Sequence, residues 1–207
     1  MIDLHKADGL WTVTLNRPDK ANSLTRAMLV QLAETAEAAR HDPPRALILT
    51  GAGKVFSAGA DLDEARAGLA TDPVWERLSG AMAALPCLTI AALNGTLAGG
   101  AMGMALACDL RLAVPGAKFF YPVMKLGFLP QPSDPARLAA LIGPARAKMI
   151  LMAGARIEAP EALAWGLVDR LAPPETLLAE ARALTADACA ASAAHVAGIK
   201  ALIPAQG

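Results

Sequence analysis

The sequence predicts an α/β protein with largely parallel sheets. Short apolar runs typical of strands recur along the chain, and segments with helical caps and spacing separate them. Hydrophobic residues make up 55% of the 207 positions and aromatic residues only 4%, so a large core is built mainly from aliphatic side chains and alanine. Because no low-complexity linker divides the chain, we expect a single domain over residues 1–207.

The first elements alternate between strands and a helix. Residues 10–15 alternate apolar and polar side chains, the period of a half-buried strand. Ser23 or Thr25 can cap a helix that runs to about residue 40. The continuous apolar run at residues 46–50 indicates a buried strand, and residues 55–57 look like a second extended piece.

The middle of the chain repeats this order. Asp61 is placed to cap a helix, with Asp63 and Glu64 in the first turn, where the helix dipole favours acids. The further expected elements are a helix at 73–84, a buried strand at 88–93, a helix at 99–107, and strands at 110–114 and 119–121.

The last third of the chain is predicted to be helical after a long irregular stretch. Four prolines interrupt residues 122–135, which we expect to lack regular structure. Helices are expected at 136–141, 145–152, 161–165 and from 174 to about 194.

Charge and cysteine usage narrow the class of protein. The 19 basic and 19 acidic residues balance, and no long run of one sign occurs, which argues against nucleic acid or an anionic membrane as a partner. Cys87, Cys108 and Cys189 are distant from one another and predict buried, structural thiols in a reducing compartment. The N-terminus has no apolar signal region, and glycines interrupt the apolar run at 88–106. We expect a soluble, cytoplasmic protein.

Two glycine-containing turns each lie between a strand and a helix. They span residues 56–61 and 94–101. Backbone N–H groups at the start of a helix carry partial positive charge, and two that converge on one point would form an oxyanion hole. The alternative is that these glycines only allow the turns to pack closely.

Other common sites are not supported by the sequence. Gly53-Lys54 lacks the ending of a P-loop, the third glycine of a dinucleotide fingerprint is absent, and no serine lies in a G-x-S-x-G elbow. The three histidines show no metal-ligand spacing, so we expect no metal site.

Four blocks together resemble a known family. They are LNRPDKANSL (15–24), VFSAGADL (55–62), NGTLAGGAMGMALACDLRLA (94–113) and AWGLVDR (164–170), in the order of the enoyl-CoA hydratase/isomerase, or crotonase, superfamily. The resemblance implies a superhelical ββα core, over about residues 1–135, followed by C-terminal helices over about 136–207. It also implies an acyl-CoA or enoyl-CoA substrate, no cofactor besides the coenzyme A of that substrate, and a homotrimer or dimer of trimers.

The resemblance also assigns roles to individual residues. The oxyanion hole would be formed by the N–H groups of Ala60 and Gly100, with Ala60, Asp61, Leu62 and Asp63 lining the thioester and pantetheine. Lys20, Asn22 and Leu24 would lie against the adenine end. The basic side chains that could meet the coenzyme's phosphates, or could simply be solvated, are Arg17, Lys20, Arg26 and Lys54.

The chain departs from the family hydratases at both glutamate positions. Gly103 and Val123 stand where the resemblance places the two carboxylates, and neither side chain can transfer a proton. Gln131 occupies a position where related enzymes carry an acid. Asp134 could act as a base or could cap the next helix, with Pro135 at its first position.

Two expectations follow from these departures. Tyr121 and Lys125 are weaker candidates for acid–base chemistry. Members of the family usually continue for some tens of residues further, so the pocket would be more open or covered by a partner subunit. The sequence leaves two functions open: an enzyme that stabilises a thioester enolate, as an isomerase or atypical hydratase, or a catalytically silent acyl-CoA-binding or assembly protein. A peptidase is disfavoured because no Ser–His pair is evident.

Overall fold

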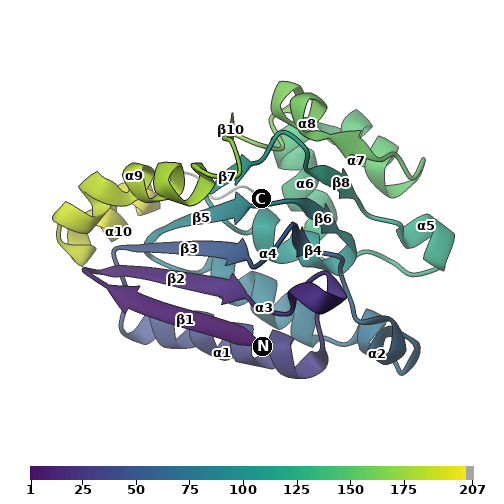
Figure 1. Cartoon of the computed structure of the whole chain (residues 1–207), viewed down its shortest axis with the longest axis horizontal. Helices are drawn as coiled ribbons and strands as arrows, with labels where there is room; N and C mark the ends of the chain where they lie inside the picture. The colour runs from purple at the N-terminus through teal and green to yellow at the C-terminus, as the bar shows by residue number, and fades with distance from the viewer. Residues whose placement is uncertain (204–207) are drawn as a thin grey trace.

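The computed structural model describes residues 1–203, in which a six-stranded sheet forms the centre of the molecule (Figure 1). Its strand order is β1-β2-β3-β5-β7-β10, and every neighbouring pair is parallel except β1 with β2. The strands are β1 (Ile2–Ala7), β2 (Leu10–Leu15), β3 (Ala46–Gly51), β5 (Leu88–Leu93), β7 (Leu110–Ala113) and β10 (Arg170–Leu171).

A second, four-stranded sheet follows the carboxyl ends of the central strands. It has the order β4-β6-β8-β9, with strands β4 (Val55–Ser57), β6 (Thr96–Ala98), β8 (Lys118–Phe120) and β9 (Ile157–Glu158). Strands β3, β5 and β7 each pass through a short turn into β4, β6 and β8, and a helix follows each pair. The chain therefore repeats a ββα unit, which confirms the expected ββα core and the mixed α/β class.

Helices cover both faces of the central sheet. Helices α1 and α3 pack together along one face, and α9 contacts β3, β5 and β7 (Figure 1). The α-helices are α1 (Arg26–His41), α2 (Leu62–Arg66), α3 (Val74–Ala83), α4 (Met102–Leu106), α5 (Val123–Leu126), α6 (Asp134–Ile142), α7 (Pro144–Leu151), α8 (Ala159–Trp165), α9 (Leu177–Ala190) and α10 (Ala193–Leu202). Short 3₁₀ helices occur at η1 (Pro18–Lys20), η2 (Leu69–Thr71) and η3 (Gly99–Ala101).

Several sequence-based boundaries were wrong for local reasons. The helix expected at 99–107 begins as a 3₁₀ turn and becomes α-helical only at Met102. The stretch expected to be irregular contains α5. The long last helix breaks because Ala191 is extended and the Ser192 hydroxyl accepts a hydrogen bond from the His195 N–H, which starts α10. Residues 204–207 of the predicted domain lie outside the described residues.

Strand β1 is an element that the sequence analysis did not predict. It pairs with β2 across a two-residue turn in which Asp8 and Gly9 both have positive φ, at 51° and 80°. An Asp-Gly pair between two extended segments is a strong hairpin signal, because both central residues of this turn type need positive φ. The Asp8-Gly9 pair is thus a local signal for this hairpin.

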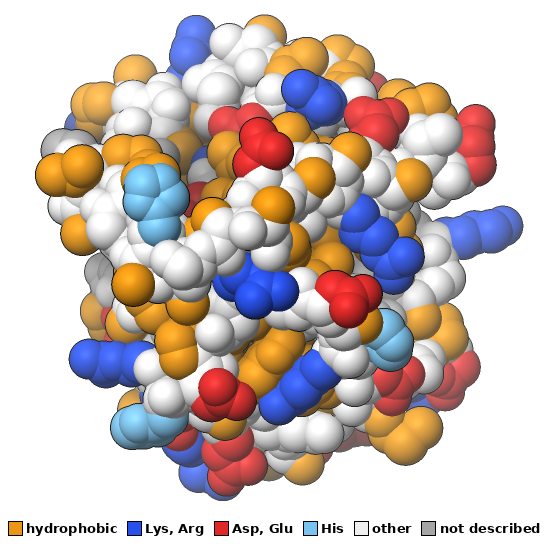
Figure 2. Space-filling model, turned by 90° about the vertical axis from the view of Figure 1, so that its left-hand side faces the viewer, with side chains coloured by type: hydrophobic (Ala, Val, Ile, Leu, Met, Phe, Trp, Pro, Cys, Tyr) orange, Lys and Arg blue, Asp and Glu red, His pale blue; other side chains and the backbone are white. Residues whose placement is uncertain are grey.

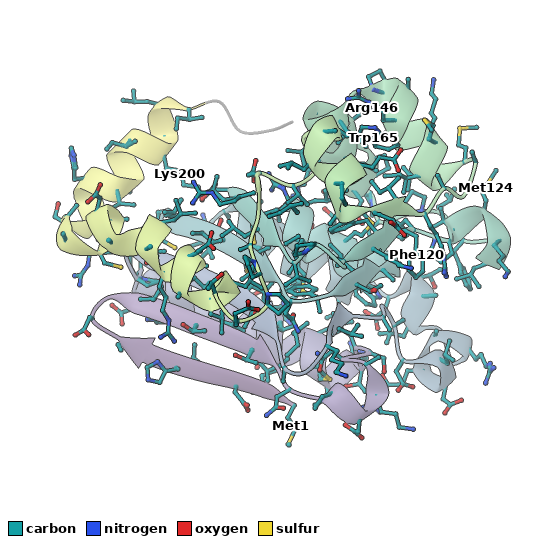
Figure 3. All side chains as sticks on the ribbon, turned by 45° about the horizontal axis from the view of Figure 1, so that its top comes forward. Met1, Phe120, Met124, Arg146, Trp165 and Lys200 are labelled. Carbon is teal, nitrogen blue, oxygen red and sulfur yellow. The ribbon has the colours of Figure 1, made fainter. Side chains whose placement is uncertain are left out.

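Two internal salt bridges connect the C-terminal part to the central sheet. Arg111 on β7 is 2% exposed, donates to the carbonyls of Leu167 and Cys108 at 3.0 and 2.7 Å, and pairs with Asp169. Lys200 points from α10 toward the sheet (Figure 3) and donates to Asp109 at 2.8 Å and to the Cys87 carbonyl at 2.9 Å. Arg111 thus holds the segment before β10 against β7, and Lys200 holds α10 against the residues that precede β5 and β7.

The three cysteines are all free thiols. Burial raises the pKa of Cys87 to about 11 and that of Cys108 to about 12, so both stay protonated near neutral pH. Cys189 is only half-buried, which corrects the expectation that all three are buried: it lies at the C-terminal end of α9.

The surface shows no large field of one sign on the face seen in Figure 2, where acidic and basic side chains are interspersed. No helix within residues 1–203 combines the length and the apolar character needed to cross a membrane.

Candidate active site

Two glycine turns, one after β4 and one after β6, approach each other closely. Gly59 and Gly99 have φ of +93° and +58°, a region that side chains rarely adopt. A Cβ on Gly59 would lie 3.0 Å from the Ala98 carbonyl oxygen, and one on Gly99 would lie 3.7 Å from the Gly59 Cα. The positive φ therefore favours glycine at both positions, and at Gly59 the close approach of the Ala98 carbonyl favours it as well.

The first turn is held by a backbone bridge to the segment before α1. The Leu24 N–H donates to the Gly59 carbonyl and the Asp61 N–H donates to the Leu24 carbonyl, both at 2.8 Å. In a parallel bridge these bonds use the peptide groups on either side of Ala60, so the N–H of Ala60 points away from residue 24. The Asp61 carboxylate then accepts from the N–H groups of Asp63 and Glu64, which confirms Asp61 as the cap of α2.

The second turn presents Gly100 at the start of η3. N–H groups in the first turn of a helix have no partner inside that helix. The indole of Trp75 packs so closely against this glycine that a Cβ at residue 100 would lie 3.2 Å from the ring. The ring is fixed by a hydrogen bond of 2.8 Å from its Nε1 to the Leu69 carbonyl. A rigid aromatic wall therefore supports the backbone at Gly100.

Both turns line one cavity of about 210 Å³. Its walls are mainly small or apolar, and Tyr121 and Gln131 are the exceptions. The lining residues are Ala58, Gly59, Ala60, Leu62, Ala65, Ala70, Trp75, Ala98, Gly99, Gly100, Phe120, Tyr121, Pro122, Val123, Leu126, Phe128, Leu129 and Gln131. Exposed apolar side chains from α2 and from the segment around α5 form the rim, among them Leu62 at 72% and Leu129 at 87% exposed. Phe120 lies near α5 in Figure 3.

Tyr121 and Asp134 form a buried polar pair next to this cavity. The Tyr121 hydroxyl donates to Asp134 Oδ2 at 3.0 Å and accepts from the Gln131 N–H at 3.3 Å. Asp134 is fully buried, and its Oδ1 has no hydrogen-bond partner. Burial raises the pKa of Asp134 to about 7, although the Tyr121 hydroxyl and the Arg137 guanidinium favour its charged form. Burial also raises the pKa of Tyr121, so the phenol is neutral near pH 7.

The alternative that Asp134 caps α6 is wrong. Ser133 holds the cap position without a side-chain cap bond, and Asp134 is already inside the first turn. Its carboxylate turns inward because Gly103 on α4 leaves room for it: a Cβ at residue 103 would lie 2.7 Å from Asp134 Oδ1. A sequence pattern alone could not reveal this contact, because residues 103 and 134 meet only in the folded chain.

Gln131, at the position where related enzymes carry an acid, also lines the cavity. Its side chain is half-buried, and its Nε2 donates to the Ala70 carbonyl at 3.4 Å. Val123 also lines the cavity, whereas Gly103 does not. Lys125 is exposed on α5.

The segment assigned to the adenine end is mostly buried. Asn22 and Leu24 are both fully buried, and only Lys20 is exposed. The Asn22 side chain accepts from the Arg17 N–H and donates to the carbonyls of Ala52 and Val55, so it joins two loops. Contact of Asn22 and Leu24 with a ligand stays a prediction.

The basic side chains near this segment differ in how they are engaged. Arg17 pairs with Asp61 at 2.8 Å, and this guanidinium lowers the pKa of the Asp61 carboxyl. Arg26 pairs with Asp72 at 2.8 Å. Lys20 and Lys54 are exposed, which leaves them as the candidates for phosphate contacts. Within residues 1–203 no group of three or more His, Cys, Asp or Glu side chains could hold a metal ion.

Comparison with known proteins identifies the family. The family model described as enoyl-CoA hydratase/isomerase matches residues 5–206. The chain is 37% identical over 195 residues to the Mycobacterium bovis protein named "Probable enoyl-CoA hydratase echA8", covering 89% of this chain and 74% of that protein. It is 35% identical over 190 residues to the 1,2-epoxyphenylacetyl-CoA isomerase of Escherichia coli, covering 87% of this chain and 72% of that enzyme.

A solved structure agrees with these sequence relatives. An enoyl-CoA hydratase from Mycobacterium avium subsp. paratuberculosis superposes with a TM-score of 0.87 at 36% identity, over 96% of this chain and 82% of that one. The family match, the relatives and this superposition each cover most of the chain. The chain therefore belongs to the enoyl-CoA hydratase/isomerase family.

Proposed function

We propose that this protein binds an acyl-CoA thioester between the two glycine turns and stabilises its enolate, as an isomerase or an atypical hydratase. The observation that carries the proposal is the meeting of the two turns in one apolar cavity. The N–H of Ala60 and the N–H of Gly100 would receive the thioester oxygen, and backbone donors of this kind stabilise the charge that develops on it.

The shape and chemistry of the cavity support a thioester ligand. The turns carry only small residues at Gly59, Gly99 and Gly100, so backbone rather than side chains lines the cavity there. The apolar rim from Leu62 to Leu129 suits an acyl chain and the pantetheine arm. Exposed Lys20 and Lys54 could meet phosphates of the coenzyme, and no cofactor beyond coenzyme A is needed for proton transfer of this kind.

The second candidate is an acyl-CoA-binding protein without turnover. It is favoured by one observation: the residues at 103 and 123, glycine and valine, cannot transfer protons. Both candidates use the same cavity, so binding alone does not separate them. Homotrimer formation is a further expectation from the resemblance, which sedimentation velocity would test.

Mass spectrometry of acyl- and enoyl-CoA thioesters incubated with the protein in deuterated water separates the candidates. Deuterium at carbon is the expected result and indicates enolate chemistry, whereas a gain of water indicates hydration. If every thioester is returned unchanged while calorimetry still detects binding, the protein is a binder and the enzyme proposal is wrong.

A further inference from the structure

We propose that Tyr121 and Asp134 form a proton-transfer pair that moves a proton along the acyl chain of a bound enoyl-CoA thioester. This inference rests on the proposed function and adds to it the groups that carry the proton. Tyr121 would be the catalytic residue that touches substrate, and Asp134 would act through it.

The location of Tyr121 is the first argument. Among the cavity-lining residues of the described chain, Tyr121 is the only one with a titratable side chain. The cavity's remaining polar side-chain groups are the Gln131 amide, which cannot accept a proton from carbon, and the Trp75 N–H, which is engaged with Leu69. A proton that leaves the substrate inside this cavity therefore has Tyr121 as its side-chain acceptor.

The hydrogen bonds of Tyr121 define a direction for the proton. The hydroxyl accepts from the Gln131 N–H and donates to Asp134 Oδ2, which leaves one lone pair on its oxygen for the substrate. Because the phenol is neutral near pH 7, it cannot act as a base unless its own proton leaves at the same time. The Asp134 carboxylate, at 3.0 Å, is positioned to take that proton.

The surroundings of Asp134 are unusual for a structural carboxylate. Its Oδ1 is buried without a hydrogen-bond partner, which costs stability that a purely structural role would not justify. The groups that face it are Tyr121, Glu76 from α3 and Arg137 from its own helix. Both of these charged neighbours are engaged elsewhere, since Glu76 accepts from Ser133 and Arg137 donates to Ser79. The carboxylate can therefore gain and lose a proton without breaking an ion pair.

The reaction balances within these groups. A substrate α-proton bonds to Tyr121 Oη, the hydroxyl proton moves to Asp134 Oδ2, and the C–H electron pair passes into the thioester as an enolate. In the reverse direction Asp134 returns its proton to Tyr121, which protonates the γ-carbon, so a β,γ double bond becomes an α,β double bond. One acid–base pair is sufficient for this shift, whereas addition of water needs further groups to hold and activate the water. The substrate class is therefore β,γ- and α,β-enoyl thioesters.

The test measures the rate at which wild type converts a 3-enoyl-CoA into the conjugated 2-enoyl-CoA, by ultraviolet absorbance from pH 5 to 9. The wild-type rate should rise with pH and level off above about 7, because the ionised Asp134 accepts the proton. Tyr121→Phe and Asp134→Asn should each lower the plateau about 100-fold or more, the usual worth of a general base. The remaining activity of Asp134→Asn should lack the inflection near pH 7.

The controls and outcomes separate this inference from the proposed function. Asp187→Asn, an exposed carboxylate on α9, should leave rate and profile unchanged. Circular dichroism and calorimetry of bound thioester show that each variant folds and binds. An active wild type whose profile survives in Asp134→Asn, or whose rate survives in Tyr121→Phe, overturns the pair alone. A wild type that neither shifts the double bond nor takes up deuterium at carbon overturns the enzyme proposal as well.

Discussion

The free energy of unfolding of the wild-type protein should fall as the pH rises through about 7, and replacing Asp134 by asparagine should remove this fall. In the folded state burial raises the pKa of this carboxyl from 3.8 to about 7, so between these values the folded protein binds a proton that the unfolded chain releases. The resulting stabilisation is fully present below pH 4 and is lost as the pH rises through about 7. At about 1.36 kcal/mol per pKa unit, the loss between pH 5 and pH 8 is about 2.5 kcal/mol.

Urea unfolding of wild type and Asp134→Asn at pH 5, 6, 7 and 8, at one protein concentration, measures this difference. The free energy of unfolding of the variant relative to wild type should rise by about 2.5 kcal/mol across the series. Its absolute level is less informative, because an amide N–H₂ beside the unpartnered Oδ1 position adds a cost of about 1–3 kcal/mol. Asp187→Asn should run parallel to wild type. If the free energies of unfolding of wild type and Asp134→Asn changed with pH in parallel, the raised pKa assigned to Asp134 would be refuted.

Three further substitutions test the site and its support. Gly100→Pro removes one of the two proposed oxyanion donors and should abolish thioester binding or turnover, measured by calorimetry and the deuterium assay; unchanged values with an intact circular dichroism spectrum would contradict the assignment. Gly103→Ala places a Cβ 2.7 Å from Asp134 Oδ1 and should cost about 1–3 kcal/mol in urea unfolding, whereas Gly116→Ala, with no atom within 4 Å, should cost almost nothing. Arg111→Met leaves two buried carbonyls without their donor, while Asp169 keeps its bond from the backbone N–H of residue 111, and should cost about 3 kcal/mol or more. The exposed Arg170→Met should change little, and equal values for the two would contradict the buried role of Arg111.

Strands β3 and β5 and the glycine turns were predictable because their signals are local. The apolar runs at β3 and β5 each lie within six residues, and glycine turns between strand and helix mark changes of direction that few other residues allow. The cap of α2 was predictable for the same reason, since the capping bonds of Asp61 come from the N–H groups of Asp63 and Glu64 in the next turn. These features need no information about distant parts of the chain.

The Tyr121–Asp134 pair could not be assigned from the sequence because its geometry depends on a distant glycine. Ser-Asp-Pro has the composition of a helix start, and that local pattern favoured a cap. The carboxylate instead enters the space beside Gly103, on a helix 31 positions earlier in the chain, and only the packing of α4 against α6 creates that space. The break between α9 and α10 differs, because the cap at Ser192 is a local signal that depends only on the next turn.

Infrared difference spectroscopy of a bound acyl-CoA thioester, with the carbonyl carbon unlabelled and then labelled with ¹³C, tests the central claim most directly. If the N–H groups of Ala60 and Gly100 receive the thioester oxygen, the carbonyl stretch of the bound ligand should lie below that of the free thioester, and Gly100→Pro should return it toward the free value. A bound thioester with the carbonyl stretch of the free molecule would contradict the account, because the oxygen would then lie outside any oxyanion hole.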